Sequence, residues 1–211
     1  DEPFADDSTI PSYFVCKIAR ENVTVALSGL GGDEIFGGYE RYLGFKLRGL
    51  YRNVPEFIRK QIIARMVAQL PERADGHYTI NHMKRFVRAD RLDADMCYLS
   101  YLSILDTDLK QALFSEQLWS RDRENRCDDM FLRYFNSQNV DGDINSLDRA
   151  LYCDLKTYLP EDILAVTDRL SMHHSLEVRV PFIDHRFLEF CATIPADIRM
   201  KGFQKKYLLK K

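Results

Sequence analysis

Residues 28–39 read Ser-Gly-Leu-Gly-Gly-Asp-Glu-Ile-Phe-Gly-Gly-Tyr, directly after the short apolar run Val23-Thr-Val-Ala-Leu27. The run holds three β-branched residues, which is typical of a buried strand in a parallel sheet. A glycine-rich loop after such a strand can bring backbone N–H groups close to a phosphate, and open α/β sheets bind ligands at such turns. The two acids that follow could hold Mg²⁺, which prefers carboxylate and phosphate oxygens.

The glycines by themselves leave two interpretations open. No Gly-Lys-Ser/Thr follows, as a P-loop requires, and Gly29, Gly31 and Gly32 do not meet the spacing of G-x-G-x-x-G. The alternative to a phosphate cradle is a tight turn whose glycines supply positive φ angles, with Asp33 and Glu34 capping the next helix. The remaining sequence has to decide between them.

The composition is that of an ordinary globular protein. The chain has 211 residues, 45% of them hydrophobic and 29% charged, and a formal net charge of −2. This balance gives no reason to expect nucleic acid or a membrane surface as a partner, and no apolar run approaches the roughly 18–20 residues that cross a bilayer. The five cysteines are scattered without CxxC spacing, so we expect neither a disulfide framework nor a zinc site, and a cytoplasmic location.

Hydrophobic periodicity predicts a mostly helical chain with one clear strand, Val23–Leu27. One strand cannot form a sheet, and the chain starts and stops as if inside a larger protein, so we expect it to be a piece of a longer polypeptide with further strands. A polar loop is predicted over about residues 136–146. Helices are predicted over about residues 11–20, 39–52, 57–70, 77–90, 94–105, 107–119, 147–159, 161–177 and 184–194.

Three further segments accompany the glycine-rich loop in a fixed order. They are Asp1-Glu-Pro-Phe-Ala-Asp-Asp-Ser8, the adjoining Asp168-Arg-Leu-Ser-Met172 and Ser175-Leu-Glu-Val-Arg-Val-Pro-Phe-Ile-Asp-His185, and Lys205-Lys-Tyr-Leu-Leu209. Together they resemble the synthetase domain of glutamine-hydrolysing asparagine synthetase over nearly the whole chain. The resemblance implies an α/β fold of the adenine-nucleotide alpha hydrolase-like class in the longer protein. Residues 1–211 would then supply a partial, mostly helical synthetase domain with at least one parallel strand.

The resemblance also implies an activity, that of an ATP-dependent amide-forming ligase. In this family an N-terminal glutaminase domain releases ammonia, and a tunnel carries it to the synthetase domain, of the ATP-pyrophosphatase type. There ATP and Mg²⁺ activate the aspartate side chain as β-aspartyl-AMP with release of pyrophosphate, and ammonia then gives asparagine and AMP. The implied partners are aspartate, ATP, glutamine-derived ammonia and a covalently linked glutaminase domain, and a homodimer is left open.

The matching motif positions imply the site residues. Asp33 matches the acid that helps hold Mg²⁺ on the pyrophosphate, and Lys206 matches the catalytic lysine that faces the phosphates. Adenylation builds negative charge on the phosphates, which a lysine, a metal and backbone dipoles stabilise. Positions that bind ATP are matched by Ser28, Gly29, Gly31 and Gly32. Further candidates with less defined roles are Glu34, Asp168, Glu177 and Arg179.

Most of these candidates also have a structural alternative. Lys206 lies in a basic run and could belong to a solvated helix end. Asp168 could form a surface ion pair with Arg169, which would contribute little to stability. Glu177 and Arg179 flank a predicted turn and could fix that turn rather than touch a substrate.

Two departures from the family pattern bear on function. The Ser-Gly-Gly-x-Asp-Ser pyrophosphate loop and the glutaminase cysteine are absent, and we expect both before Asp1 in the longer protein, which leaves this chain inactive alone. Leu30 stands where asparagine synthetases often carry an acid and β-lactam-forming members can carry a tyrosine. Because leucine cannot accept a proton, the acceptor stays open. The alternatives are a related amidotransferase with another carboxylate acceptor and a non-catalytic helical interaction module.

Overall fold

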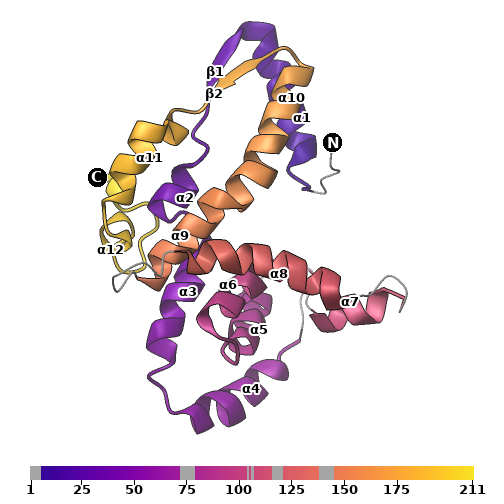
Figure 1. Cartoon of the computed structure of the whole chain (residues 1–211), viewed down its shortest axis with the longest axis vertical. Helices are drawn as coiled ribbons and strands as arrows, with labels where there is room; N and C mark the ends of the chain where they lie inside the picture. The colour runs from indigo at the N-terminus through magenta and orange to yellow at the C-terminus, as the bar shows by residue number, and fades with distance from the viewer. Residues whose placement is uncertain (1–5, 72–78, 104, 106, 116–120, 138–144) are drawn as a thin grey trace. The chain divides into compact units, whose positions relative to one another are not determined.

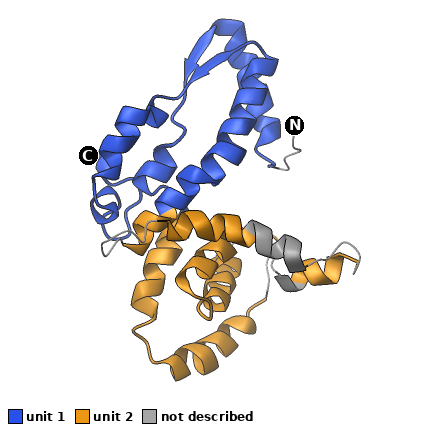
Figure 2. Cartoon of the chain, in the orientation of Figure 1, with its two compact units in different colours: residues 1–39, 151–211 blue, residues 40–150 orange. Residues whose placement is uncertain are grey.

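The computed structural model describes residues 6–71, 79–103, 105, 107–115, 121–137 and 145–211. The chain divides into two compact units (Figure 2). The first combines the two ends of the sequence, Asp1–Tyr39 and Leu151–Lys211, and the second is Glu40–Ala150. Within the described ranges, no helix is long and apolar enough to cross a membrane.

The first unit contains a two-stranded parallel sheet (Figure 1). Strand β1 (Val25–Leu27) pairs along its whole length with β2 (Glu177–Arg179). The Ser28 N–H extends the ladder by donating to the Arg179 carbonyl at 2.8 Å. Because the strands are parallel, the loops that follow them start at the same edge of the sheet, where open α/β sheets place their sites.

The second strand corrects the prediction of one helix over residues 161–177. A π-helical turn, η2 (Leu159–Leu164), leads into α10 (Ala165–His173), and the chain is already extended at β2. The helix ends because Ser175 takes a left-handed φ of 55°. The Leu176 N–H then donates to the Ser171 carbonyl at 2.9 Å, as in a Schellman cap. Serine rather than glycine occupies the left-handed position, so the sequence does not predict this helix end.

The prediction that β1 is buried is also wrong for this structure. Val25 is 39% exposed and Leu27 is 75% exposed. The described residues provide only two strands, which are too few to enclose β1 on both faces. The β-branched run therefore indicates the correct secondary structure but not the burial.

Helices make up the other described elements of the first unit. Helix α1 (Thr9–Asn22) packs against α10 (Figure 1). After β1 comes the short helix α2 (Gly32–Phe36), which packs on α11 (His185–Ala192) through a core of Ile35, Phe36 and Cys191. The remaining elements of this end of the chain are η3 (Pro181–Ile183), α12 (Ala196–Arg199) and η4 (Leu208–Lys210).

The second unit is helical over its described residues and has an aromatic core. Tyr98 of α6 (Ala94–Leu102) is fully buried, and its ring stacks on Tyr42 of α3 (Glu40–Tyr51) at a centroid distance of 6.2 Å. Phe135 of α8 (Arg121–Asn136) lies 5.9 Å from the same ring. The other elements are η1 (Ile58–Ile63), α4 (Ala64–Ala68), α5 (Thr79–Ala89), α7 (Thr107–Leu113) and α9 (Ser146–Lys156), within which the boundary between the units falls.

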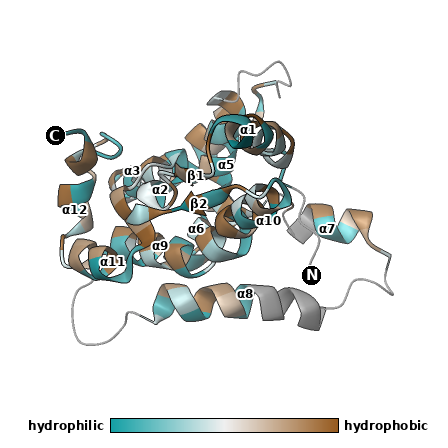
Figure 3. Cartoon of the chain, turned by 90° about the horizontal axis from the view of Figure 1, so that it is seen from above, coloured by the Kyte–Doolittle hydropathy of each residue, from teal (hydrophilic) through white to brown (hydrophobic). Residues whose placement is uncertain are grey.

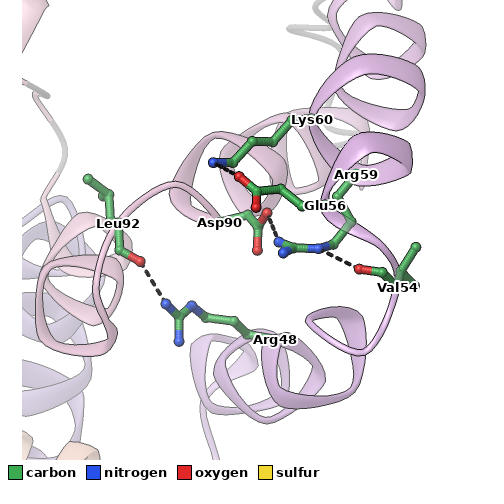
Figure 4. A network of polar contacts seen from close by, with 7 residues as sticks. All are labelled: Arg48, Val54, Glu56, Arg59, Lys60, Asp90 and Leu92. Carbon is green, nitrogen blue, oxygen red and sulfur yellow. Dashed lines mark hydrogen bonds and ion pairs between the residues drawn. The ribbon is translucent and has the colours of Figure 1, made fainter.

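Buried arginines connect the helices of this unit (Figure 4). Arg59 pairs with Asp90 and donates to the Val54 carbonyl at 2.8 Å. Arg48 donates to the Leu92 carbonyl at 2.6 Å. Arg59 and Asp90 are at most 9% exposed, so loss of one partner would leave a buried charge unpaired. These contacts give the arginines a structural role.

Most predicted helices are confirmed, with one clear omission. The predicted ranges leave residues 121–135 without a helix, but α8 covers them. Its first half is highly charged, and the apolar spacing becomes visible only at Phe131 and Phe135. The predicted polar loop lies outside the described residues over 138–144, as does the end of the predicted helix 107–119 over 116–119.

A side-chain cap at the start of α11 can be tested. Asp184 Oδ1 accepts from the Arg186 and Phe187 N–H groups at 3.0 and 3.3 Å. We expect Asp184→Ala to lower the free energy of unfolding in urea by about 1 kcal/mol. Asp93 is a matched control, since it precedes α6 without a side-chain cap bond, and Asp93→Ala should cost clearly less. Equal losses would contradict the capping role.

Candidate functional site

The glycine-rich loop packs closely against the segment that follows β2. Gly31 has a φ of 84°, and a Cβ there would lie 2.6 Å from Ile183 Cγ2. A Cβ on Gly32 would lie 3.4 Å from the Phe182 ring. Glycine is therefore required at residue 31 for its left-handed backbone and for the close approach of η3. Both features agree with the tight-turn interpretation of the loop.

The other predicted ATP-binding residues lie in the same loop. Ser28 is half-buried, and its main chain is bonded to the end of β2. Gly29 is exposed, and its carbonyl accepts the Gly32 N–H at 3.3 Å. Contact of Ser28, Gly29, Gly31 and Gly32 with a nucleotide stays a prediction.

The two acids of the motif face different surroundings. The Asp33 side chain is 36% exposed, whereas Glu34 is only 1% exposed. They are neighbours on the five-residue helix α2, so their side chains point in different directions. Asp33 can therefore meet a ligand, and Glu34 cannot do so without movement.

The predicted metal acid and the predicted lysine form an ion pair. Lys206 Nζ lies 2.8 Å from Asp33 Oδ1, and the Lys206 side chain is 29% exposed. Lys206 has a left-handed φ of 52°, and its N–H donates to the Phe36 carbonyl at 3.1 Å. The C-terminal segment thus folds back onto the end of α2, which does not fit a freely solvated helix end. A left-handed lysine is uncommon and is maintained by its surroundings.

Gly38 lies directly against this ion pair. A Cβ on Gly38 would come within 3.0 Å of both Asp33 Oδ1 and Lys206 Cε. The Gly38 N–H donates to the Asp33 carbonyl at 2.8 Å. A Cβ at residue 38 would displace the two charged side chains, because their ends occupy its space. The sequence contains a signal for this, since a second glycine follows Gly37 near the acid, but the residue was not predicted as part of the site.

Glu34 is held by Tyr39, another residue that the sequence did not identify as part of the site. The Tyr39 hydroxyl donates to Glu34 Oε1 at 2.6 Å. Burial raises the pKa of the Glu34 carboxyl above its ordinary value, the hydrogen bond from Tyr39 opposes this shift, and the negative charges of Asp33 and Asp154 add to it. Burial, together with the bond to Glu34, also raises the pKa of Tyr39, so its phenol stays protonated and can donate.

A buried arginine completes the support of α2. Arg199 is 5% exposed, and its Nη1 donates to the Ile35 carbonyl at 2.9 Å. Carbonyls in the last turn of a helix lack partners within the helix, and here Arg199 and the Lys206 N–H supply them for Ile35 and Phe36. No local sequence pattern marks Arg199, because its partner is distant in the sequence.

The remaining candidates make their side-chain contacts away from Asp33 and Lys206. Asp168 is exposed on α10. Glu177 and Arg179 form an ion pair with each other at 2.7 Å, and each side chain is more than half exposed, so the pair contributes little to stability. In the described part of the chain, no side-chain hydrogen bond or ion pair joins these three residues to Asp33 or Lys206.

The side chains of Asp33 and Lys206 are suited to binding magnesium together with a phosphate. Among the described residues, no three His, Cys, Asp or Glu side chains gather as a metal site. Mg²⁺ is commonly bound through one or two carboxylates plus phosphate oxygens. Asp33 supplies one partly exposed carboxylate, and Lys206 supplies a positive charge 2.8 Å away for a phosphate. The residues therefore fit a magnesium–phosphate group better than a bare ion.

Comparison with known proteins identifies the family. The chain combines a mostly helical structure with a parallel sheet, consistent with a nucleotide alpha-hydrolase-like fold. The asparagine synthase family profile matches residues 1–211. The chain belongs to the asparagine synthase family, which confirms the predicted family and fold class.

Three relatives illustrate the range of the similarity. Glutamine-hydrolysing asparagine synthetase 1 of Bacillus subtilis is 32% identical over 214 residues, which cover 100% of this chain and 31% of the relative. Synthetase 3 of the same organism is 36% identical over 213 residues, with 100% and 27% covered. Amidase chyE of Penicillium rubens is 22% identical over 215 residues, with 92% and 30% covered. The chain thus spans less than a third of the length of these relatives.

The contact of Gly38 with the ion pair gives a direct test. In Gly38→Ala the new methyl group should push Lys206 Nζ and Asp33 Oδ1 more than 4 Å apart in a crystal structure. Because these partly exposed side-chain ends can move aside, the free energy of unfolding in urea should change by less than about 1 kcal/mol.

Gly49→Ala is the matched control for this substitution. Gly49 is exposed on α3, and a Cβ there meets no atom within 4 Å, so alanine should stabilise the helix by up to about 1 kcal/mol. An ion pair that keeps its distance in Gly38→Ala would contradict the assigned contact.

Proposed function

We propose that this chain is the C-terminal part of the synthetase domain of a glutamine-hydrolysing asparagine synthetase located in the cytoplasm. The longer protein is an ATP-dependent ligase that makes asparagine from aspartate and glutamine-derived ammonia through β-aspartyl-AMP. One observation carries the proposal: Asp33 and Lys206, which the resemblance assigns to magnesium and the phosphates from distant motifs, lie 2.8 Å apart. Family membership of the whole chain supports it.

The chemistry assigned to the chain is stabilisation of negative charge. Bound Mg²⁺ supplies neutralisation of the pyrophosphate as it leaves the α-phosphate. Asp33 is the carboxylate that holds the metal, and Lys206 Nζ faces the phosphate oxygens. The Lys206 backbone is fixed to Phe36, so its ammonium group needs little rearrangement as charge develops.

We propose that the longer protein also covers the apolar face of the first unit. Ile10, Phe14 and Ile18 recur every four residues along α1 and are 54–68% exposed. Figure 3 colours the chain by hydropathy and shows hydrophobic positions along α1. Leu27 of β1 is a further exposed apolar residue, at 75%. Large exposed apolar patches mark contact surfaces. The upstream segment that we assign to this face carries the pyrophosphate loop and leads to the glutaminase domain.

Lys206→Ala and Asp33→Ala in the longer protein test the proposed function. Each should lower aspartate-dependent AMP release at least about 100-fold, the typical effect of removing one group that stabilises transition-state charge. Lys210→Ala is the control, because Lys210 is exposed in the same basic segment, and it should retain full activity. Normal turnover by both site variants would overturn the assignment of Asp33 and Lys206 to the site, whereas no AMP release by the unmodified longer protein with any carboxylate would favour the interaction module.

The chain by itself should be inactive. If the pyrophosphate loop lies upstream, residues 1–211 contain only part of the ATP site. We expect no ATP–pyrophosphate exchange by the 211-residue chain under conditions where the longer protein exchanges readily. Clear exchange by the chain alone would show that the described site is sufficient and would refute the partial-domain proposal.

A related amidotransferase with another acceptor is the second candidate function. It is favoured by Leu30, which cannot accept a proton at a position where asparagine synthetases often have an acid. The chain is also similar to a protein named as an amidase, so its relatives are not all named as asparagine synthetases. AMP release with aspartate, compared with release with other carboxylates, separates the two candidates, since only the synthetase should prefer aspartate.

A further inference from the structure

The proposed chemistry uses Asp33 but gives no task to the neighbouring Glu34. Burying a carboxyl group is unfavourable unless it is hydrogen-bonded, and Glu34 is 1% exposed. It lies next to the acid that we assign to the metal, on the same helix turn. A buried acid at this place therefore calls for an explanation beyond packing of the core.

Tyr39 holds the Glu34 carboxyl from the far side of a glycine turn. Its hydroxyl donates to Glu34 Oε1 at 2.6 Å. Its ring packs edge-on against Tyr158, with centroids 5.7 Å apart and planes at 81°. Tyr39 is thus fixed both by its ring and by its hydroxyl group. The Glu34–Tyr39 bond closes a short loop of chain that contains Gly37 and Gly38.

This glycine turn forms one wall of the Asp33–Lys206 ion pair. Gly37 has a left-handed φ of 67°, and a Cβ there would meet Met200 Sδ at 3.0 Å. Gly38 has no room for a Cβ beside Asp33 and Lys206. Glycines are the most flexible residues of a chain, so a turn of two glycines needs an outside restraint to keep a fixed position.

We propose that Glu34 and Tyr39 are positioning residues, whose hydrogen bond fixes the Gly37–Gly38 turn and thereby holds Asp33 and Lys206 in the arrangement that binds magnesium pyrophosphate. This proposal rests on the proposed function of Asp33 and Lys206. Neither Glu34 nor Tyr39 contacts a substrate. The bond needs an acceptor at residue 34 and a hydroxyl donor at residue 39, so glutamine can replace Glu34, whereas phenylalanine cannot replace Tyr39.

The test measures AMP release by the longer protein carrying Tyr39→Phe, Glu34→Ala or Glu34→Gln. Tyr39→Phe and Glu34→Ala should lower kcat about tenfold, corresponding to one lost hydrogen bond at the site, and should raise the magnesium concentration for half-maximal rate. The KM for aspartate should stay unchanged. Glu34→Gln should keep kcat within about threefold of the unmodified enzyme, because its side-chain carbonyl still accepts from Tyr39.

Controls separate positioning from stability. Tyr134→Phe removes a hydroxyl from a half-buried tyrosine of the second unit and should leave kcat unchanged. Urea unfolding shows whether each variant is folded. If Glu34→Ala does not fold, Tyr39→Phe still tests the proposal, because it removes only a single oxygen atom. A normal kcat and normal magnesium dependence in folded Tyr39→Phe would overturn the proposal, as would a Glu34→Gln enzyme as slow as Glu34→Ala.

Two further variants, Asp33→Ala and Lys206→Ala, are measured in the same assay. They distinguish failure of the positioning role from failure of the roles assigned to Asp33 and Lys206. If both lose activity while Tyr39→Phe keeps it, the positioning role fails and the proposed function stands. If both keep full activity, the roles assigned to Asp33 and Lys206 fail, and the positioning proposal fails with them.

Discussion

The parallel pairing of β1 with β2 is the interaction on which the candidate site depends. It joins two segments that are far apart in the sequence and starts both of their following loops at one edge of the sheet. Phe182 and Ile183 of one loop then press against Gly31 and Gly32 of the other. The path of the glycine-rich loop, and with it the place of α2 and Asp33, follows from this contact.

The two interpretations of the glycines, a phosphate cradle and a tight turn, are not exclusive. Gly31 and Gly37 satisfy backbone geometry, since both have positive φ angles and border α2. Gly38 satisfies a different need, because it leaves room for the ion pair. The tight turn is thus the means by which an acid, a lysine and a short helix are brought together. A loop built in this way leaves the Asp33 side chain of α2 partly exposed.

The sequence predicted what depends on local pattern. Ordered motifs identified the family, and periodicity identified most helices. The end of α10 was not predicted, because Ser175 rather than glycine takes the left-handed conformation. Strand β2 was therefore not predicted either, since it begins just after that helix end. The roles of Tyr39 and Arg199 were not predicted for another reason, since they come from contacts that form only after folding. The motifs could pair Asp33 with Lys206 in function, but only the tertiary fold sets their distance.

The main chain, rather than the ion pair, keeps Asp33 and Lys206 in place. Partly exposed ion pairs contribute little energy, and both side chains are roughly one third exposed. By contrast, the Asp33 carbonyl is bonded to the Gly38 N–H, and the Lys206 N–H is bonded to Phe36. Under the proposed function, Asp33 exchanges its lysine partner for a metal and Lys206 turns to a phosphate, while both backbones stay fixed. We infer that such a site binds its ligand by exchanging weak contacts, because the restraints that define it lie in the backbone.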